Sequence, residues 1–199
     1  MLEASGERPP INIEGELVAL GPLRRDLIPT YHRWHNDVAI SRTFPLPQPT
    51  TLEQEETTYN ELSTAERMVF FTVYERSTWT AVGTTYLTDI DYRHRRAEFG
   101  VMIGEADHRG KGLGTEATRL MLDYAYTALG LHNVMLIVYE FNLAGVRAYE
   151  KAGFREFGRR RQSHWMGGRC WDVIYMDCLT SEFTSPRLSQ VFLPDEPRR

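Results

Sequence analysis

Residues 98–116 read Glu98-Phe-Gly-Val-Met-Ile-Gly-Glu-Ala-Asp-His-Arg109-Gly110-Lys111-Gly112-Leu113-Gly114-Thr115-Glu116. The first half is typical of a buried strand, and the three glycines at 110, 112 and 114 form a loop that opens directly into a helix. Backbone N–H groups at the start of a helix are unpaired and carry partial positive charge, so they bind anions. The stretch therefore predicts a site for a phosphate or pyrophosphate group of a cofactor.

Two common phosphate-binding loops do not fit this stretch. In a Walker loop the lysine is followed by Ser or Thr, whereas Lys111 is followed by Gly112. In the dinucleotide pattern G-x-G-x-x-G the third glycine comes one position later than Gly114, and no alternation of strands and helices surrounds the loop. The pattern that remains is Arg109-x-x-Gly112-x-Gly114.

This pattern, between a strand and a helix, resembles the acetyl-CoA loop of the GNAT superfamily of N-acetyltransferases. A second stretch, Asn142-Leu-Ala-Gly-Val-Arg-Ala-Tyr149-Glu-Lys-Ala-Gly-Phe154, resembles the second signature of the same family. The segment Tyr31-His-Arg-Trp-His-Asn-Asp37 is similar to the first helix of the branch that contains ribosomal-protein N-terminal and spermidine acetyltransferases. The resemblance covers roughly residues 12 to 179.

The resemblance implies an α/β (α+β) GNAT fold, with a mixed, mostly antiparallel sheet of about seven strands, flanking helices, and a splay at the acetyl-CoA strand. It implies one acetyltransferase domain at 12–179, after a flexible lead at 1–11 and before a tail at 180–199, which we expect to be disordered or to lie on a neighbour. It also implies that acetyl-CoA is the cofactor. The residues expected to hold it are Val101, Met102, Ile103, Arg109, Gly110, Lys111, Gly112, Leu113, Gly114, Asn142 and Tyr149.

Two residues are expected to handle protons in acetyl transfer. An amine with a pKa of about 10.4 must lose a proton before it can attack. Glu98 matches a strand glutamate that is proposed as the base in several family members, and partial burial would raise its pKa into the useful range. Glu98 could instead be a structural carboxylate paired with Arg95, Arg96 or another cation, or could only orient the substrate. Tyr149 matches the tyrosine that donates a proton or hydrogen bond to the departing sulfur.

The acceptor side of the site is expected near residues 30 to 60. His32, His35 and Phe44 are candidates for substrate contacts, and we assign His35, Phe44 and Glu98 to substrate binding. The alternative is that they are surface or packing residues. Three prolines between Arg42 and Thr51 predict a loop there.

Hydrophobic periodicity predicts the remaining elements. Strands are expected at 16–20, 68–74, 80–87, 97–103, 134–139 and in a closing hairpin of 154–164 and 170–179, and helices at 24–36, 52–64, 112–129 and 142–151. The helix at 52–64 should be capped by Thr50 or Thr51, with Gln54 or Glu55 completing a capping box. Gly100 is consistent with a bulge that aims the backbone of residues 101–103.

Composition sets broader bounds. The chain has 199 residues, 42% hydrophobic and 25% charged, which fits one globular domain. No apolar run is long enough to cross a bilayer and the first residues have no apolar signal core, so we expect a cytoplasmic protein without membrane contact. A net charge of −4 argues against nucleic-acid binding and suits a cationic amine. Cys170 and Cys178 have no metal-binding spacing and lie too far apart along one strand for a bridge, so no metal is expected and both are interpreted as reduced packing residues.

The function that follows is acetyl-CoA-dependent N-acetyl transfer to a primary amine, by direct transfer in a ternary complex. A polyamine or another small amine is the favoured acceptor, with a protein N-terminus as the alternative acceptor. A catalytically silent acyl-CoA-binding module is the alternative from another functional class. A homodimer is expected only because the family implies one.

Overall fold

The computed structural model describes residues 8–43 and 48–195. Its centre is an eight-stranded sheet with the strand order β1-β2-β3-β4-β5-β6-β8-β7. All neighbouring strands are antiparallel except β5 and β6, which are parallel. This confirms the expected mixed, mostly antiparallel sheet, with one strand more than the approximate number expected.

The strands are β1 (Ile13–Glu14), β2 (Val18–Pro22), β3 (Val69–Glu75), β4 (Ala81–Asp91), β5 (Arg96–Ile103), β6 (Asn133–Tyr139), β7 (Arg155–Met166) and β8 (Arg169–Leu179). The helices are α1 (Ile28–His35), α2 (Val38–Ser41), α3 (Leu52–Leu62), α4 (Leu113–Asp123), α5 (Leu143–Ala152) and α6 (Leu188–Val191). Short 3₁₀ turns lie at Arg25–Leu27, Ala106–His108 and Thr180–Glu182, and a π-helical turn, Tyr124–Ala128, extends α4.

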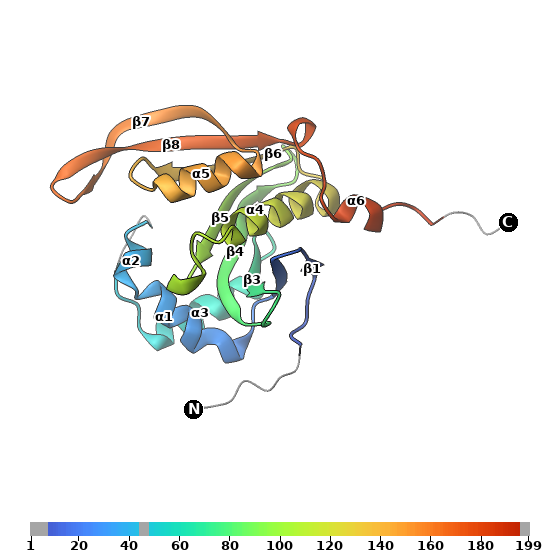
Figure 1. Cartoon of the computed structure of the whole chain (residues 1–199), viewed down its shortest axis with the longest axis horizontal. Helices are drawn as coiled ribbons and strands as arrows, with labels where there is room; N and C mark the ends of the chain where they lie inside the picture. The colour runs from blue at the N-terminus through green and yellow to red at the C-terminus, as the bar shows by residue number, and fades with distance from the viewer. Residues whose placement is uncertain (1–7, 44–47, 196–199) are drawn as a thin grey trace.

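Helices cover both faces of the sheet (Figure 1). Side chains alternate along β5, so Ala97 and Phe99 join the large core that also contains α4, whereas Met102 joins a smaller cluster with Tyr31 and Trp34 of α1. The β7–β8 hairpin projects beyond the body of the sheet (Figure 1). β5 therefore contributes side chains to a different core cluster on each of its two faces.

The start of α4 explains two of the loop glycines. Gly110 and Gly112 have φ values of +75° and +86°, a backbone conformation that side-chain-bearing residues rarely adopt. Gly112 is the N-cap of α4 and supplies no side chain to cap the first N–H groups. The helix start therefore has the open backbone donors that the sequence predicts.

Most element boundaries predicted from the sequence agree with the structure to within a few residues. The capping box at α3 is formed by Thr51 and Gln54. The first strand differs, since β2 continues through Pro22, which was expected to break it. Pro22 lies beyond the residues of β2 that pair with β1. On the β1 side, therefore, no described strand residue stands opposite Pro22 to need the N–H group that proline lacks.

The C-terminal tail differs from the expectation of a disordered or neighbour-bound segment. Residues 180–195 are placed on the protein's own surface, and Leu188 is buried in the large core. The side chain of Asp123, at the end of α4, is fully buried and accepts hydrogen bonds of 2.9 Å from the backbone N–H groups of Arg187 and Leu188. A buried carboxylate needs such donors, which explains why this part of the tail is fixed to α4.

Candidate active site

The parallel pair β5 and β6 separates after a short contact. Only Arg96, Ala97 and Glu98 of β5 pair with β6, at Asn133, Val134 and Met135. Val101 to Ile103 still pair with β4 on their other side. The splay expected at this strand is thus present, and it leaves backbone groups of 101–103 open on one side, as a strand-like ligand arm would require.

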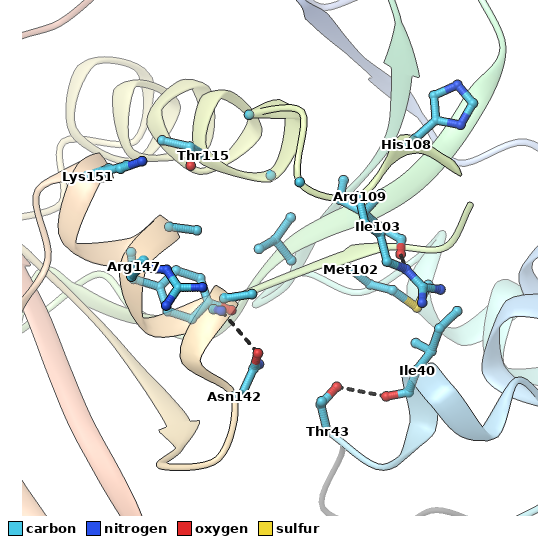
Figure 2. Close-up of a pocket in the computed structure, with 18 of the residues that line it drawn as sticks. Ile40, Thr43, Met102, Ile103, His108, Arg109, Thr115, Asn142, Arg147 and Lys151 are labelled. Atoms are coloured by element: carbon cyan, nitrogen blue, oxygen red, sulfur yellow. Dashed lines mark hydrogen bonds between the residues drawn. The ribbon is translucent and has the colours of Figure 1, made fainter. Parts of the chain in front are cut away.

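A cavity of about 500 Å³, here called the cofactor cavity, lies at this splay. Figure 2 shows its lining side chains converging from β5, the start of α4, α5 and the end of α2. Nine of the residues predicted to bind the cofactor line it, namely Val101, Met102, Ile103, Arg109, Gly110, Gly112, Gly114, Asn142 and Tyr149. Lys111 and Leu113 are not among its lining residues; the Lys111 side chain is exposed, and the Leu113 side chain is buried in the large core.

The Arg109 side chain bonds to the end of β5 and lines the cofactor cavity. Its guanidinium donates hydrogen bonds to the carbonyl oxygens of Ile103 and Gly104, at 3.1 and 3.0 Å, and lies 3.6 Å from a carboxylate oxygen of Asp37. The side chain thus fixes the glycine loop to the end of β5. The backbone N–H groups at the start of α4 are the other groups in this loop that suit an anion.

Further cations line the cofactor cavity that were not predicted from the sequence. Arg147 and Lys151 come from α5, where their four-residue spacing places them on one side of the helix, and Arg42 comes from the end of α2. Figure 2 shows Lys151 near Thr115 of α4, and Arg147 across the cavity from Arg109. Two cations four residues apart within the second motif were the signal that could have indicated them. Together with the open helix start, they fit a ligand that carries several phosphates.

Asn142 and Tyr149 both lie where the second motif places them. Asn142 is the N-cap of α5, and its side chain accepts a hydrogen bond of 3.0 Å from the backbone N–H of Gly145. The Tyr149 ring packs edge-on against Phe99 and Phe154. Burial raises the pKa of the Tyr149 phenol, and the nearby Tyr86 raises it further, so the hydroxyl keeps its proton at neutral pH.

A second cavity of about 560 Å³ lies on the other face of the sheet, between α1, α3 and strands β3 to β5. His35 lines this second cavity, as predicted for a substrate contact, and its Nδ1 lies 2.8 Å from a carboxylate oxygen of Glu55. His32 instead bonds the carbonyl of Thr50. Phe44 lies outside the described residues. Met102 lines both cavities, so they meet at this point of β5.

Glu98 lies at the edge of the second cavity. It is exposed, so the expected partial burial is wrong: alternation along β5 turns it away from the large core. Its cross-strand partner Thr88 lines the second cavity. Burial raises the pKa of the nearby Tyr86 phenol, and the charge of Glu98 raises this pKa further. Glu98 therefore lies close to the second cavity without being part of its lining.

Gly100 does not form the bulge suggested by the sequence. It pairs regularly with Tyr86 of β4, and a Cβ at this position would lie only 2.1 to 2.5 Å from atoms of the Tyr86 ring. The glycine provides space for the phenol to lie across β5. The ring lines the second cavity, as Met102 does, and its close approach to Gly100 is a contact between strands that the sequence did not reveal.

Other residues near the site are structural. His108 lines the cofactor cavity, but Figure 2 shows its ring directed away from the other lining residues, and its Nε2 is 3.5 Å from Glu75.

Cys178 is buried and Cys170 is exposed, so only Cys178 is the packing residue expected; both are free thiols. Across residues 8–43 and 48–195, no group of side chains suits a metal ion. No helix in the same ranges could span a membrane.

Comparison with known proteins identifies the family. Residues 18–155 match the model of the acetyltransferase (GNAT) domain. Spermidine N(1)-acetyltransferase of Vibrio cholerae serotype O1 is 37% identical over 102 residues, which span 51% of this chain and only 58% of that relative. The human α/β-tubulin-N-acetyltransferase 9 is 32% identical over 155 residues, 71% of this chain and 74% of the relative.

A solved structure agrees with these sequence matches. The crystal structure of spermidine N-acetyltransferase from Vibrio cholerae in complex with CoA and spermine superposes with a TM-score of 0.77 at 30% identity, over 84% of this chain and 98% of that one. The family match covers β2 to the start of β7, which includes the glycine loop, the splay and Tyr149. The chain therefore belongs to the GNAT family of N-acetyltransferases, which use acetyl-CoA.

Proposed function

We propose that this protein transfers the acetyl group of acetyl-CoA directly to the primary amine of a small molecule. The observation that carries the proposal is that two cavities on opposite faces of the sheet meet at Met102. One has the phosphate-binding features of the donor site, and the other is large enough for an acceptor. An amine reaching Met102 from the second cavity would meet the donor beside the free backbone of β5.

On the donor side, bound acetyl-CoA supplies a thioester carbon open to attack by an unprotonated amine. The backbone of residues 101–103 holds the thioester arm, and the start of α4 with Arg147 and Lys151 holds the phosphates. The Tyr149 hydroxyl donates to the sulfur as the C–S bond breaks, and the raised pKa of this phenol keeps its proton available.

On the acceptor side, Glu98 takes the proton that the amine loses. Its exposure supports transfer through water rather than direct contact. A carboxylate in water is a weak base, so it serves best as the first acceptor in a path to solvent. Glu98→Gln should lower kcat/KM most at low pH, where the amine most needs help in losing its proton.

Direct transfer is supported by the positions of the cysteines. Neither Cys170 nor Cys178 is among the described residues that line the two cavities. Incubation of the protein with acetyl-CoA alone, followed by intact-mass analysis, tests this point. An acetyl group retained on the protein that then passes to an added amine would refute direct transfer.

Thiol release from acetyl-CoA tests the activity itself. The panel should contain spermidine and spermine, because the similar Vibrio cholerae structure holds spermine, together with monoamines and short peptides. We expect amine-dependent release with at least one small amine and mass confirmation of the acetylated product. CoA binding without release for any member of the panel would favour the catalytically silent module.

A further inference from the structure

The second cavity has mostly uncharged walls. Its apolar and aromatic lining includes Leu23, Tyr31, Tyr59, Leu62, Phe70 and Tyr86. The remaining lining is largely of hydroxyl and amide side chains, which can hydrogen-bond without carrying charge. A ligand that fills this space must therefore leave water for an apolar surface.

The ionisable side chains that line the second cavity, apart from the tyrosines, contact each other. Apart from the tyrosines, its ionisable residues among 8–43 and 48–195 are His35 and Glu55. Glu55 is only 6% exposed, and its carboxylate lies 2.8 Å from the His35 ring. The face of Tyr59 likewise holds the guanidinium of Arg25, 5.2 Å from the ring centre. An ammonium entering here would have to compete with the His35 ring for Glu55 and with the Arg25 guanidinium for the face of Tyr59.

Two stacked aromatic rings, here called the aromatic wall, line the second cavity near the place where the acceptor amine would react. Phe70 of β3 and Tyr86 of β4 stack with their ring centres 5.0 Å apart and their planes at 24°. Gly100 lets the Tyr86 side chain lie across β5, two residues along the strand from Met102, where the two cavities meet. The pair thus presents a flat apolar surface close to where the acceptor amine must react.

A polyamine and an apolar monoamine place different demands on this cavity. A polyamine carries several ammonium groups, and those not being acetylated need carboxylates, because a charge removed from water without a partner is strongly disfavoured. Glu98 at the edge can serve the reacting amine, but the lining offers no second unengaged carboxylate among the described residues. An aromatic or aliphatic body, in contrast, matches the walls directly.

From this lining we infer that the acceptor is a monoamine with an aromatic or aliphatic body, not a polyamine. The inference rests on the proposed function, because it assigns the second cavity to the acceptor. The reacting nitrogen lies near Met102, where the two cavities meet, and the body of the molecule packs on Phe70 and Tyr86.

The first experiment compares 2-phenylethylamine and hexylamine with spermidine and spermine. Thiol release at saturating acetyl-CoA should give a kcat/KM for 2-phenylethylamine at least tenfold above that for spermidine. Equal or better use of spermidine would overturn the inference. Calorimetric titration of each amine into the CoA-bound protein distinguishes failure of this inference from failure of the proposed function. Monoamine binding without turnover would support the inferred ligand class and contradict the proposed acetyl transfer. Tighter binding of spermidine than of the monoamines would contradict the inferred ligand class.

The second experiment alters the aromatic wall. Phe70→Ala should lower kcat/KM for 2-phenylethylamine at least tenfold and leave the KM for acetyl-CoA unchanged, because Phe70 does not line the cofactor cavity. Phe157→Ala is the matched control, since Phe157 is 57% exposed on β7, away from both cavities. An unchanged kcat/KM in Phe70→Ala would contradict the inference.

A third variant adds the missing carboxylate, in case Phe70→Ala does not fold. Thr58 lines the second cavity from an exposed position on α3, where glutamate suits a helix. Thr58→Glu should raise the ratio of spermidine to 2-phenylethylamine kcat/KM at least tenfold. A ratio that does not change would show that charge in this cavity does not select the acceptor.

Discussion

Removal of the Tyr149 hydroxyl isolates the chemical step from binding and folding. The ring is held edge-on by Phe99 and Phe154, and phenylalanine preserves these contacts. Among the described residues, no hydrogen bond from this hydroxyl to the protein is present, so its loss leaves no partner unsatisfied. What Tyr149→Phe removes is the donor that faces the cofactor cavity.

The expected loss follows from the strength of one hydrogen bond to a charged group. Such a bond contributes about 1.5 to 3 kcal/mol, which corresponds to a decrease in kcat of about 10- to 150-fold. The dissociation constant for CoA should change by less than about twofold, because binding depends on the backbone donors and cations elsewhere. The fall in kcat should equal the fall in kcat/KM, as for a contact made only in the transition state.

The measurement pairs thiol-release kinetics with calorimetric CoA binding. Tyr126→Phe is the matched control, since the Tyr126 hydroxyl donates a 2.7 Å hydrogen bond to the carbonyl of Cys178, remote from both cavities. That variant should lose about 1 kcal/mol of unfolding free energy with wild-type kcat. A wild-type kcat in Tyr149→Phe would refute the assigned role, and weaker CoA binding with normal kcat would assign the hydroxyl to binding instead.

Three further predictions concern pH and stability. Because burial and Tyr86 raise the pKa of Tyr149, kcat should stay level or rise up to about pH 10 as the acceptor loses its proton, and a decline centred well below that pH would exclude Tyr149 as the donor. The Glu116 carboxylate accepts hydrogen bonds of 2.6 to 2.7 Å from the backbone N–H groups of residues 16 to 18, so Glu116→Gln should lower the unfolding free energy in urea by about 2 to 4 kcal/mol, and a change below about 0.5 kcal/mol would contradict this. Arg33, and then the indole of Trp34, hold the pKa of the Glu105 carboxyl below its usual range, so the stability that this carboxylate adds is present at neutral pH and is lost as the pH falls through its folded pKa. Glu105→Gln should therefore lower the unfolding free energy by about 1 kcal/mol at pH 7 and by progressively less as the pH falls below the usual range of a carboxyl group; a cost that does not depend on pH would show that charge is not involved.

The donor half of the site was predictable because its features are local in sequence. Gly110 and Gly112 adopt positive φ angles within a single loop, and Thr51 caps α3 through a residue three positions away. The expected separation of β5 from β6 also holds. In each case, a short run of residues specifies backbone geometry without contributions from distant segments.

Other features depend on contacts between distant segments and were missed. Nothing local to Gly100 shows that it makes space for Tyr86 on the neighbouring strand. Asp123 similarly gave no sign that it would bind the backbone at Arg187 and Leu188 and so fix the tail. The exposure of Glu98 could have been inferred from strand alternation, because Ala97 and Phe99 on either side of it are buried.

The same distinction explains why family membership predicts the donor better than the acceptor. In the proposed donor site, backbone groups are the main contacts of acetyl-CoA, and a glycine pattern and a splayed strand can provide them whatever the neighbouring side chains are. The cavity proposed for the acceptor is lined by side chains from α1, α3, β3 and β4, and most of these can change without disturbing the proposed donor site. Tyr86 shows the coupling that does exist, because its phenol requires Gly100 on the donor strand. Replacement of Tyr86 by a carboxylate would fit beside that glycine and bring a charge to the junction of the two cavities, so the choice between apolar and polycationic amines could turn on this one position of β4.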